Sequence, residues 1–325
     1  MLSFLENSVD NHIHCCPHIN ERSTNIFEVV EHAENNKMYA IGLMDNFSNT
    51  SGYASLIRKH FPERYYQMGI AEANMIGVAS GMAKTGDIVF AHTFAVFASR
   101  RALDQIAMQI AYPKAKVLIM GFLPGIATNL GVSHQSIEDI ACFRSLPNMN
   151  IFEPYHENQL LPILNMALES PNPSYLRLKR FDKMYDSIDE SIKIGEPQVL
   201  IDGEDLAIFA TGMTVDIALE AAEKIKKLYN KKVTVVNVFS LKPINEKSFC
   251  KILNGHKNII SIENHSVIGG LGTIIAEILV DNELSVKLKK LGVQDVFAEG
   301  AETDYLFKKY GISTEAILKE CENIF

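Results

Sequence analysis

The chain lacks the features that would place it in a membrane, on nucleic acid or outside the cell. Its 325 residues contain no long uninterrupted apolar run and no recognisable signal peptide, so we expect neither a transmembrane helix nor export. Positive charge is not in excess either: the net charge of −8 argues against nucleic acid or an anionic membrane as a partner. The five cysteines, an odd number, fit a reducing cytoplasm better than a disulfide framework. We therefore expect a soluble, cytoplasmic globular protein.

Repeats and low-complexity stretches are also missing, and short β-branched runs alternate instead with longer helical ones. This alternation is typical of α/β architecture with parallel sheets. The length suits two domains, and the chain becomes polar and acidic from Phe181 to Pro197, as a linker does. We predict two consecutive parallel-sheet α/β domains, residues 1–185 and residues 186–325.

Hydrophobic periodicity and turn residues locate the elements within these domains. The predicted strands of the first domain are Tyr39–Met44, Ile88–His92, Lys116–Gly121, Asn150–Glu153 and Tyr175–Leu178. Its predicted helices are Ser23–Asn35, Glu72–Lys84, Phe97–Ala111, Ser136–Ser145 and Glu157–Leu168. In the second domain the predicted strands are Leu206–Ala210, Lys232–Val238, Asn258–Glu263 and Val286–Leu291, and the predicted helices are Val215–Tyr229, Glu246–Leu253 and Gly272–Val280.

Glu72 is a lone carboxylate at the point where a strand-like segment gives way to an apolar helix. That helix is too apolar to lie on a surface, so we expect Glu72 to face an interior. A buried carboxylate requires a partner, because removal from water disfavours its charge. The alternative interpretation is an acid at a helix start, beside the positive end of the helix dipole.

Two local motifs carry weaker signals. Residues 12–18 hold three histidines and two cysteines that could ligate zinc, but their spacing is not that of a standard zinc module and Pro17 favours an extended arm. Residues 269–272, Gly-Gly-Leu-Gly, precede a helix and could bind phosphate, yet they do not complete a dinucleotide fingerprint. We therefore predict neither a metal site nor a dinucleotide site.

Four stretches of the chain, in this order, resemble landmarks of the transketolase family. They are residues 69–72 (Gly-Ile-Ala-Glu), 92–97 (His-Thr-Phe-Ala-Val-Phe), 131–135 (Gly-Val-Ser-His-Gln) and 136–149, followed by Pro154. Each motif alone is weak, but their order and spacing together are specific and extend over most of the chain. The resemblance implies a pyrimidine-binding domain for thiamine diphosphate, followed by a transketolase-like carboxy-terminal domain.

One motif of that family is missing: the Gly-Asp-Gly sequence that marks the domain binding the diphosphate through magnesium. Gly86-Asp87 is followed directly by Ile88, and Asp202-Gly203 has the wrong order. The resemblance therefore implies the carboxy-terminal subunit of a split transketolase, a transferase active only with a partner chain that carries that domain and its Mg²⁺. We expect two copies of each chain in a heterotetramer, with self-association of this one.

The resemblance also assigns roles to individual residues. Glu72 would share a proton with a nitrogen of the cofactor's pyrimidine ring, and His134 would face the hydroxyl groups of the ketose donor. For His134, a structural hydrogen bond is the alternative. Phe94 and Phe97 would pack against the pyrimidine, although simple core packing would also explain this spacing. The remaining implied contacts to cofactor are Ile70, Asp45 and Arg100, and those to substrate are Arg180, Arg22 and Ser48.

At three places the chain departs from the family pattern. Arg100 stands where an aromatic residue is common, Phe122 where a histidine is expected, and Asn129-Leu130 where there is an acidic pair. Because the missing acid normally recognises a donor hydroxyl, the sugar is expected to be specialised. It could carry a phosphate, a sulfonate or a nucleotide.

The expected reaction is transfer of a two-carbon ketol unit from a ketose to an aldose in carbohydrate metabolism. One alternative is the beta subunit of a 2-oxo acid dehydrogenase's decarboxylase component, which Leu103-Asp104-Gln105-Ile106 also resembles. Deoxyxylulose-phosphate synthase shares several traits but is normally one long chain. The third alternative is a transketolase-like scaffold without catalysis, which the three departures would suit.

Overall fold

The computed structural model describes residues 40–44, 61–179 and 192–325. The chain divides into two compact units. The first contains the residues up to 122, together with 146–149 and 167–187, and the second contains residues 123–145, 150–166 and 188–325. The predicted boundary between residues 185 and 186 stays a prediction.

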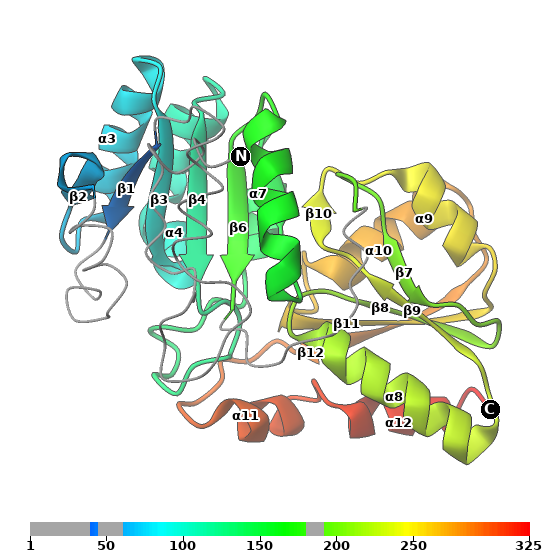
Figure 1. Ribbon diagram of the computed structural model, residues 1–325. Helices are drawn as coiled ribbons and strands as arrows, with labels where there is room; N and C mark the ends of the chain where they lie inside the picture. Colours follow the sequence, from blue (N-terminus) through cyan, green and yellow to red (C-terminus); the bar gives the residue numbers. More distant parts are fainter. Residues whose placement is uncertain (1–39, 45–60, 180–191) are drawn as a thin grey trace. The chain divides into compact units, whose positions relative to one another are not determined.

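Figure 1 labels the helices and strands. Up to residue 179 they are β1 (Ala40–Met44), η2 (Pro62–Arg64), β2 (Tyr65–Gln67), α3 (Glu72–Lys84), β3 (Ile88–Phe94), α4 (Ala95–Arg101), α5 (Leu103–Gln105), the π-helix η3 (Ile106–Ala111), β4 (Val117–Phe122), α6 (Asp139–Arg144), β5 (Asn150–Phe152), η4 (Glu157–Gln159), α7 (Leu160–Glu169) and β6 (Ser174–Leu178). From residue 192 onward they are β7 (Gln198–Ile201), β8 (Leu206–Ala210), α8 (Thr214–Tyr229), β9 (Val233–Asn237), β10 (Ser240–Lys242), α9 (Glu246–Leu253), β11 (Asn258–Ser266), α10 (Leu271–Asp281), β12 (Lys287–Val293), α11 (Thr303–Lys309) and α12 (Thr314–Cys321).

Strands of the first unit lie in the order β6-β4-β3-β1-β2, each parallel to its neighbour (Figure 1). Strands β3 and β4 are in register to their last residues, where Phe94 pairs with Phe122. Because parallel strands end at the same edge of a sheet, the segments after β2, β3 and β4 all start from one edge. Those segments lead to Glu72, to α4 and to the loop of residues 123–138.

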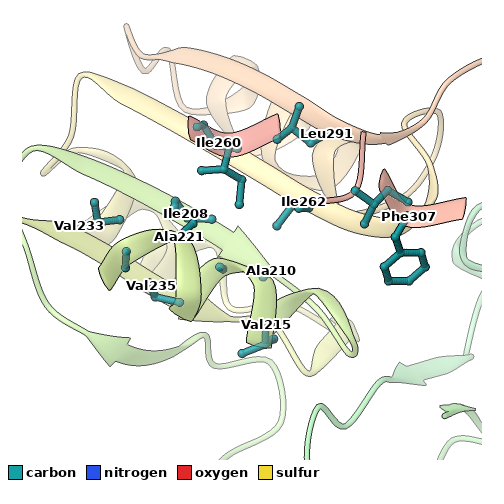
Figure 2. Close-up of a cluster of buried hydrophobic side chains, with 14 of the residues drawn as sticks. Ile208, Ala210, Val215, Ala221, Val233, Val235, Ile260, Ile262, Leu291 and Phe307 are labelled. Carbon is teal, nitrogen blue, oxygen red and sulfur yellow. The ribbon is translucent and has the colours of Figure 1, made fainter. Parts of the chain in front are cut away.

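The second unit contains a sheet in the order β12-β11-β8-β9-β7, parallel except for β7, which pairs antiparallel with β9 at the edge. Helices α8 and α12 cover one face of this sheet and α9 and α10 the other (Figure 1). Figure 2 shows how aliphatic side chains of the strands meet those of α8 and Phe307 of α11 in a buried cluster. Outside this sheet, β10 pairs antiparallel with β5.

The α/β fold with two sheets confirms the sequence prediction, and α3, β8 and α9 have the predicted bounds. The helix predicted over Phe97–Ala111 is different: it begins at Ala95, breaks at Ala102 and widens into η3. Within η3 the Tyr112 amide donates five residues back to the carbonyl of Ala107, and Ser80 of α3 donates to the Gln109 carbonyl at 2.6 Å. Packing against α3 thus compensates for the poorer internal geometry of a π-helix.

The described residues include no helix that is both long enough and apolar enough to span a bilayer. Three free cysteines lie in the described part of the chain, Cys142 in α6, Cys250 in α9 and Cys321 in α12.

Candidate active site

Glu72 is placed by a tight turn between β2 and α3. Gly69 has a φ of +73°, a conformation that L side chains rarely adopt, and its carbonyl accepts from the Ala71 amide at 2.9 Å. The turn makes Glu72 the first residue of α3, and its side chain is only 3% exposed. Glu72 is therefore buried, as the apolar helix after it predicts, and it also stands at a helix start.

The partner of Glu72 is Arg101, at the end of α4. Arg101 Nη1 lies 3.0 Å from Glu72 Oε1. The centre of the same guanidinium lies 3.9 Å from the centroid of the Phe97 ring, four residues earlier on α4. Arg101 thus joins the carboxylate to the aromatic face. Sequence reasoning missed it, although the spacing of four residues on a helix would have placed it over Phe97.

Phe94 and Phe97 lie together where β3 passes into α4. Phe94 is the last residue of β3 and precedes the first turn of α4 in an extended conformation. The two ring centroids are 5.6 Å apart with planes tilted by 40°. Phe97 is buried and Phe94 is half-buried. The structure therefore brings Glu72, Phe94 and Phe97 into one neighbourhood of the first unit.

Phe122, which stands where the resemblance expects a histidine, is a packing residue. Its ring stacks on that of the buried His92, with centroids 5.9 Å apart and planes within 8°. His92 lies on β3 and Phe122 ends β4. The last residue of β4, directly before the loop, is therefore an aromatic ring packed on a side chain of the neighbouring strand.

His134 lies in the 123–138 loop, which belongs to the second unit. It is half-buried, its amide donates to the Gly131 carbonyl at 2.9 Å, and its Nδ1 is 2.9 Å from the hydroxyl of Ser133. Asn129 and Leu130, which replace the acidic pair, are exposed, Leu130 by 50%. The loop thus presents an apolar side chain where the family pattern has a carboxylate.

The other predicted site residues divide into two groups. Ile70 is 58% exposed beside Glu72, and Arg100 is exposed at the end of α4, one residue before the arginine that contacts Glu72. Four predicted contacts lie outside the described residues: Arg22, Asp45, Ser48 and Arg180. The histidine- and cysteine-rich residues 12–18 also lie outside them. Within residues 40–44, 61–179 and 192–325, no group of three or more His, Cys, Asp or Glu side chains could hold a metal ion.

The neighbourhood of Glu72 fits a planar heterocycle. The guanidinium of Arg101 is itself flat, donates an N–H to the carboxylate and lies against the face of Phe97. An aminopyrimidine needs the same two contacts, a carboxylate at a ring nitrogen and an aromatic face. Glu72 and Phe97 therefore suit the pyrimidine of thiamine diphosphate, and Arg101 uses the contacts that this ring would make.

Two domain families match the chain. Residues 32–182 match "Transketolase, pyrimidine binding domain", and residues 195–317 match "Transketolase, C-terminal domain".

This chain also matches most of the length of several similar proteins. The "Putative transketolase C-terminal section" of Methanocaldococcus jannaschii is 39% identical over 282 residues, which are 85% of this chain and 88% of that protein. A "6-deoxy-6-sulfo-D-fructose transketolase subunit" of a Clostridium species is 38% identical over 82% of this chain and 83% of its own length. Among solved structures, "Split gene transketolase, inactive beta4 tetramer" matches with a TM-score of 0.78 and 37% identity, over 88% of this chain and 91% of that one.

Proposed function

Because this chain belongs to the transketolase family and spans its pyrimidine-binding and C-terminal domains, we propose that it is the pyrimidine-binding subunit of a split, thiamine diphosphate-dependent transketolase. A partner chain supplies the diphosphate-binding domain and the Mg²⁺. Together they transfer a two-carbon ketol unit from a ketose to an aldose. The observation that carries the proposal is the buried carboxylate of Glu72 with a flat N–H donor held against Phe97.

The chain's own contribution is to hold and polarise the pyrimidine. Glu72 would share a hydrogen-bonded proton with a nitrogen of the bound ring, because water has little access to a carboxylate that is 3% exposed. Phe97 and Phe94 offer aromatic faces that fix the ring's plane with little loss of side-chain entropy. Bound thiamine diphosphate would supply the carbanion chemistry, which no protein side chain provides.

Donor recognition falls to His134 and its loop. The imidazole can donate or accept a proton near neutral pH, which suits contact with the hydroxyl groups of a ketose. The side chain of Leu130 has no hydrogen-bonding group, so the donor is a ketose whose hydroxyl pattern differs from that of the common sugar phosphates. One similar protein is named for a sulfonated fructose, and an anionic phosphate or sulfonate group on the sugar is consistent with Arg180, Arg22 and Ser48 as its contacts.

Binding of thiamine diphosphate with Mg²⁺ tests the proposal, measured by calorimetry on this chain alone and mixed with the partner chain. We expect tight binding only in the mixture, followed by ketol transfer when sugar phosphates and sulfonates are screened. Glu72→Gln, which keeps the shape but not the charge, should lower turnover of the mixture on the order of 10²- to 10⁴-fold, the usual effect of a positioned acid–base group.

Three results would contradict the proposal. Tight binding by the chain alone would mean that it carries its own diphosphate site. Near-normal turnover of Glu72→Gln would remove Glu72 from the mechanism. If the mixture bound no cofactor, a scaffold role would replace the catalytic one.

A further inference from the structure

The 123–138 loop, which carries His134, is fastened by the carboxy-terminal half of the chain. The Ile137 carbonyl accepts from the amide of Ser266, at the end of β11. The side-chain amide of Gln135, 2% exposed, donates to the Glu299 carbonyl at 3.0 Å. Gly300 lies so close to the loop that an added Cβ would be 2.7 Å from the Asn129 carbonyl. The loop is therefore seated on β11 and on residues 299–300.

Asn264, on β11, makes two side-chain hydrogen bonds to the 123–138 loop. It is 1% exposed, its Oδ1 accepts from the Ile126 amide at 2.9 Å, and its Nδ2 donates to the Pro124 carbonyl at 2.9 Å. One side-chain amide thus satisfies two buried backbone groups of the loop, one on each side of Gly125. Aspartate lacks the donor and alanine lacks both groups, so neither can replace asparagine here.

Gly125 shows how closely the loop fits this side chain. It has a φ of +68°, and a Cβ built on it would lie 2.1 Å from Asn264 Oδ1. Neither the backbone conformation nor the space accepts a side chain. The contact between Gly125 and Asn264 can therefore be broken from either partner.

We call the two hydrogen bonds from Asn264 to Pro124 and Ile126 the clamp. The clamped segment is hydrogen-bonded directly to the residues around His134. Gly125 and Ser136 are joined by two backbone hydrogen bonds. The Gly125 amide donates to the Ser136 carbonyl at 2.7 Å, and the Ser136 amide donates to the Gly125 carbonyl at 2.9 Å. Fixing Gly125 fixes Ser136, two residues after His134. His134 in turn contacts loop neighbours, Ser133 and Gly131. The position of the imidazole thus follows the position of the loop.

We infer that Asn264 is a positioning residue for His134: by clamping Pro124 and Ile126, it sets the loop in the one place where the imidazole meets the donor's hydroxyl groups. The inference rests on the proposed function for the donor, but the clamp itself is independent of it. It gives the carboxy-terminal domain a task in the reaction, the placement of the donor loop. Glu72 and Phe97 lie on other elements and do not depend on this clamp.

The test uses the assembled complex with the partner chain and compares wild type, Asn264→Ala and Asn282→Ala. Asn282 is an exposed asparagine after α10 whose side-chain amide donates to the Ile278 carbonyl of its own helix, so its variant controls for loss of an amide elsewhere in the domain. In Asn264→Ala we expect faster hydrogen exchange at amides 126–136 and a fall in kcat/KM for the ketose donor of about 10- to 100-fold, because a misplacement of about 1 Å can cost 10²-fold. Thiamine diphosphate affinity and the KM of the acceptor should stay within about twofold, which loss of the fold would not allow.

A double-mutant cycle keeps the inference falsifiable if Asn264→Ala is poorly folded. Gly125→Ala should reproduce the exchange and donor defects. It should cost less in the Asn264→Ala background, because the added Cβ would no longer meet the asparagine side chain, although it would still lie 2.3 Å from the backbone carbonyl of residue 264. Unchanged loop exchange, or a donor kcat/KM equal to wild type, would overturn the inference, as would equal losses for donor, acceptor and cofactor. A wild-type complex without ketol transfer would overturn the proposed function and the donor role together, and the exchange data would still decide whether Asn264 holds the loop.

Discussion

Arg101 makes the two contacts that the proposed cofactor ring would also need, one with Glu72 and one with Phe97. Its Nη1 lies 3.0 Å from Oε1 of Glu72, the carboxylate that the proposed function assigns to a nitrogen of the pyrimidine ring. The same guanidinium covers the face of Phe97 that would stack on the ring. A flat cofactor and Arg101 could not use these contacts at once. The proposed function therefore requires the arginine side chain, which is 47% exposed, to turn away when the cofactor binds.

We expect Arg101→Met to raise the affinity of the assembled complex for thiamine diphosphate about fivefold. A partly exposed ion pair contributes about 0.2–1 kcal/mol and a cation over an aromatic face about 0.5–1 kcal/mol, and both contacts would no longer have to be broken. The isolated chain should unfold at a lower temperature, because Glu72 loses its partner. Calorimetric titration and thermal unfolding measure the two effects.

Arg100→Met is the matched control, since Arg100 is the exposed neighbour on the same helix. It should leave the cofactor affinity unchanged. A lower affinity in Arg101→Met would mean that Arg101 contacts the bound cofactor, and the arginine would then belong to the binding site itself.

The half-buried amine of Lys116 links the start of β4 to the carboxy-terminal end of α7. Lys116, immediately before β4, donates to the carbonyl of Ala167 at 3.0 Å and also to that of Ser170 just beyond the helix end. A cation at this end suits the helix dipole. Burial nevertheless lowers the pKa of Lys116 from 10.5 to about 8. The contact is therefore maintained at the cost of desolvating a charge.

This pKa predicts a rise in stability with pH. Between about pH 8 and 10.5 the unfolded chain still binds a proton that the folded chain has released, so the folded state gains stability as the pH rises through this window. We expect the free energy of unfolding of wild type, relative to Lys116→Met, to increase between pH 7.5 and 9.5. Denaturant titrations at several pH values measure it, with Lys84→Met at the exposed end of α3 as the control. A difference that does not change with pH would contradict the prediction.

The elements that the sequence predicts best are those whose own pattern is strong. The apolar run of α3 and the continuous apolar run of β8 have the predicted bounds because their burial follows from the local sequence alone. Strand β7, in contrast, was not predicted: its residues alternate between half-buried and exposed, and only pairing with β9 makes it a strand. The short β10 and the helices α11 and α12 were also not predicted, and η3 depends on contacts with α3.

The surface of the first unit exposes large apolar side chains, with Ile70 58%, Met108 59% and Tyr112 78% accessible. Exposed apolar groups of this size are typical of surfaces that meet another chain. A chain similar to this one forms a tetramer that is described as inactive.

We expect the isolated chain to sediment as a species heavier than its 36.3 kDa monomer. Titration with the partner chain should replace that species by a complex with equal numbers of both chains, and cofactor binding should rise in step with it. Analytical ultracentrifugation measures the masses, and a dilution series serves as the control. A monomer that binds the partner one to one, without further assembly, would contradict the expectation of a heterotetramer.

The sequence by itself determined the family and the kind of fold, because both rest on local patterns: motif order, apolar periodicity, and the absence of Gly-Asp-Gly. It also indicated that Glu72 is buried, since an apolar helix leaves its first residue little water. Only the tertiary structure decided what Glu72 touches, because Arg101 reaches it from another helix across 29 positions of sequence. It likewise decided that Asn264 holds a loop 138 positions earlier. No local sequence pattern predicts this contact, because it depends on how distant segments pack together.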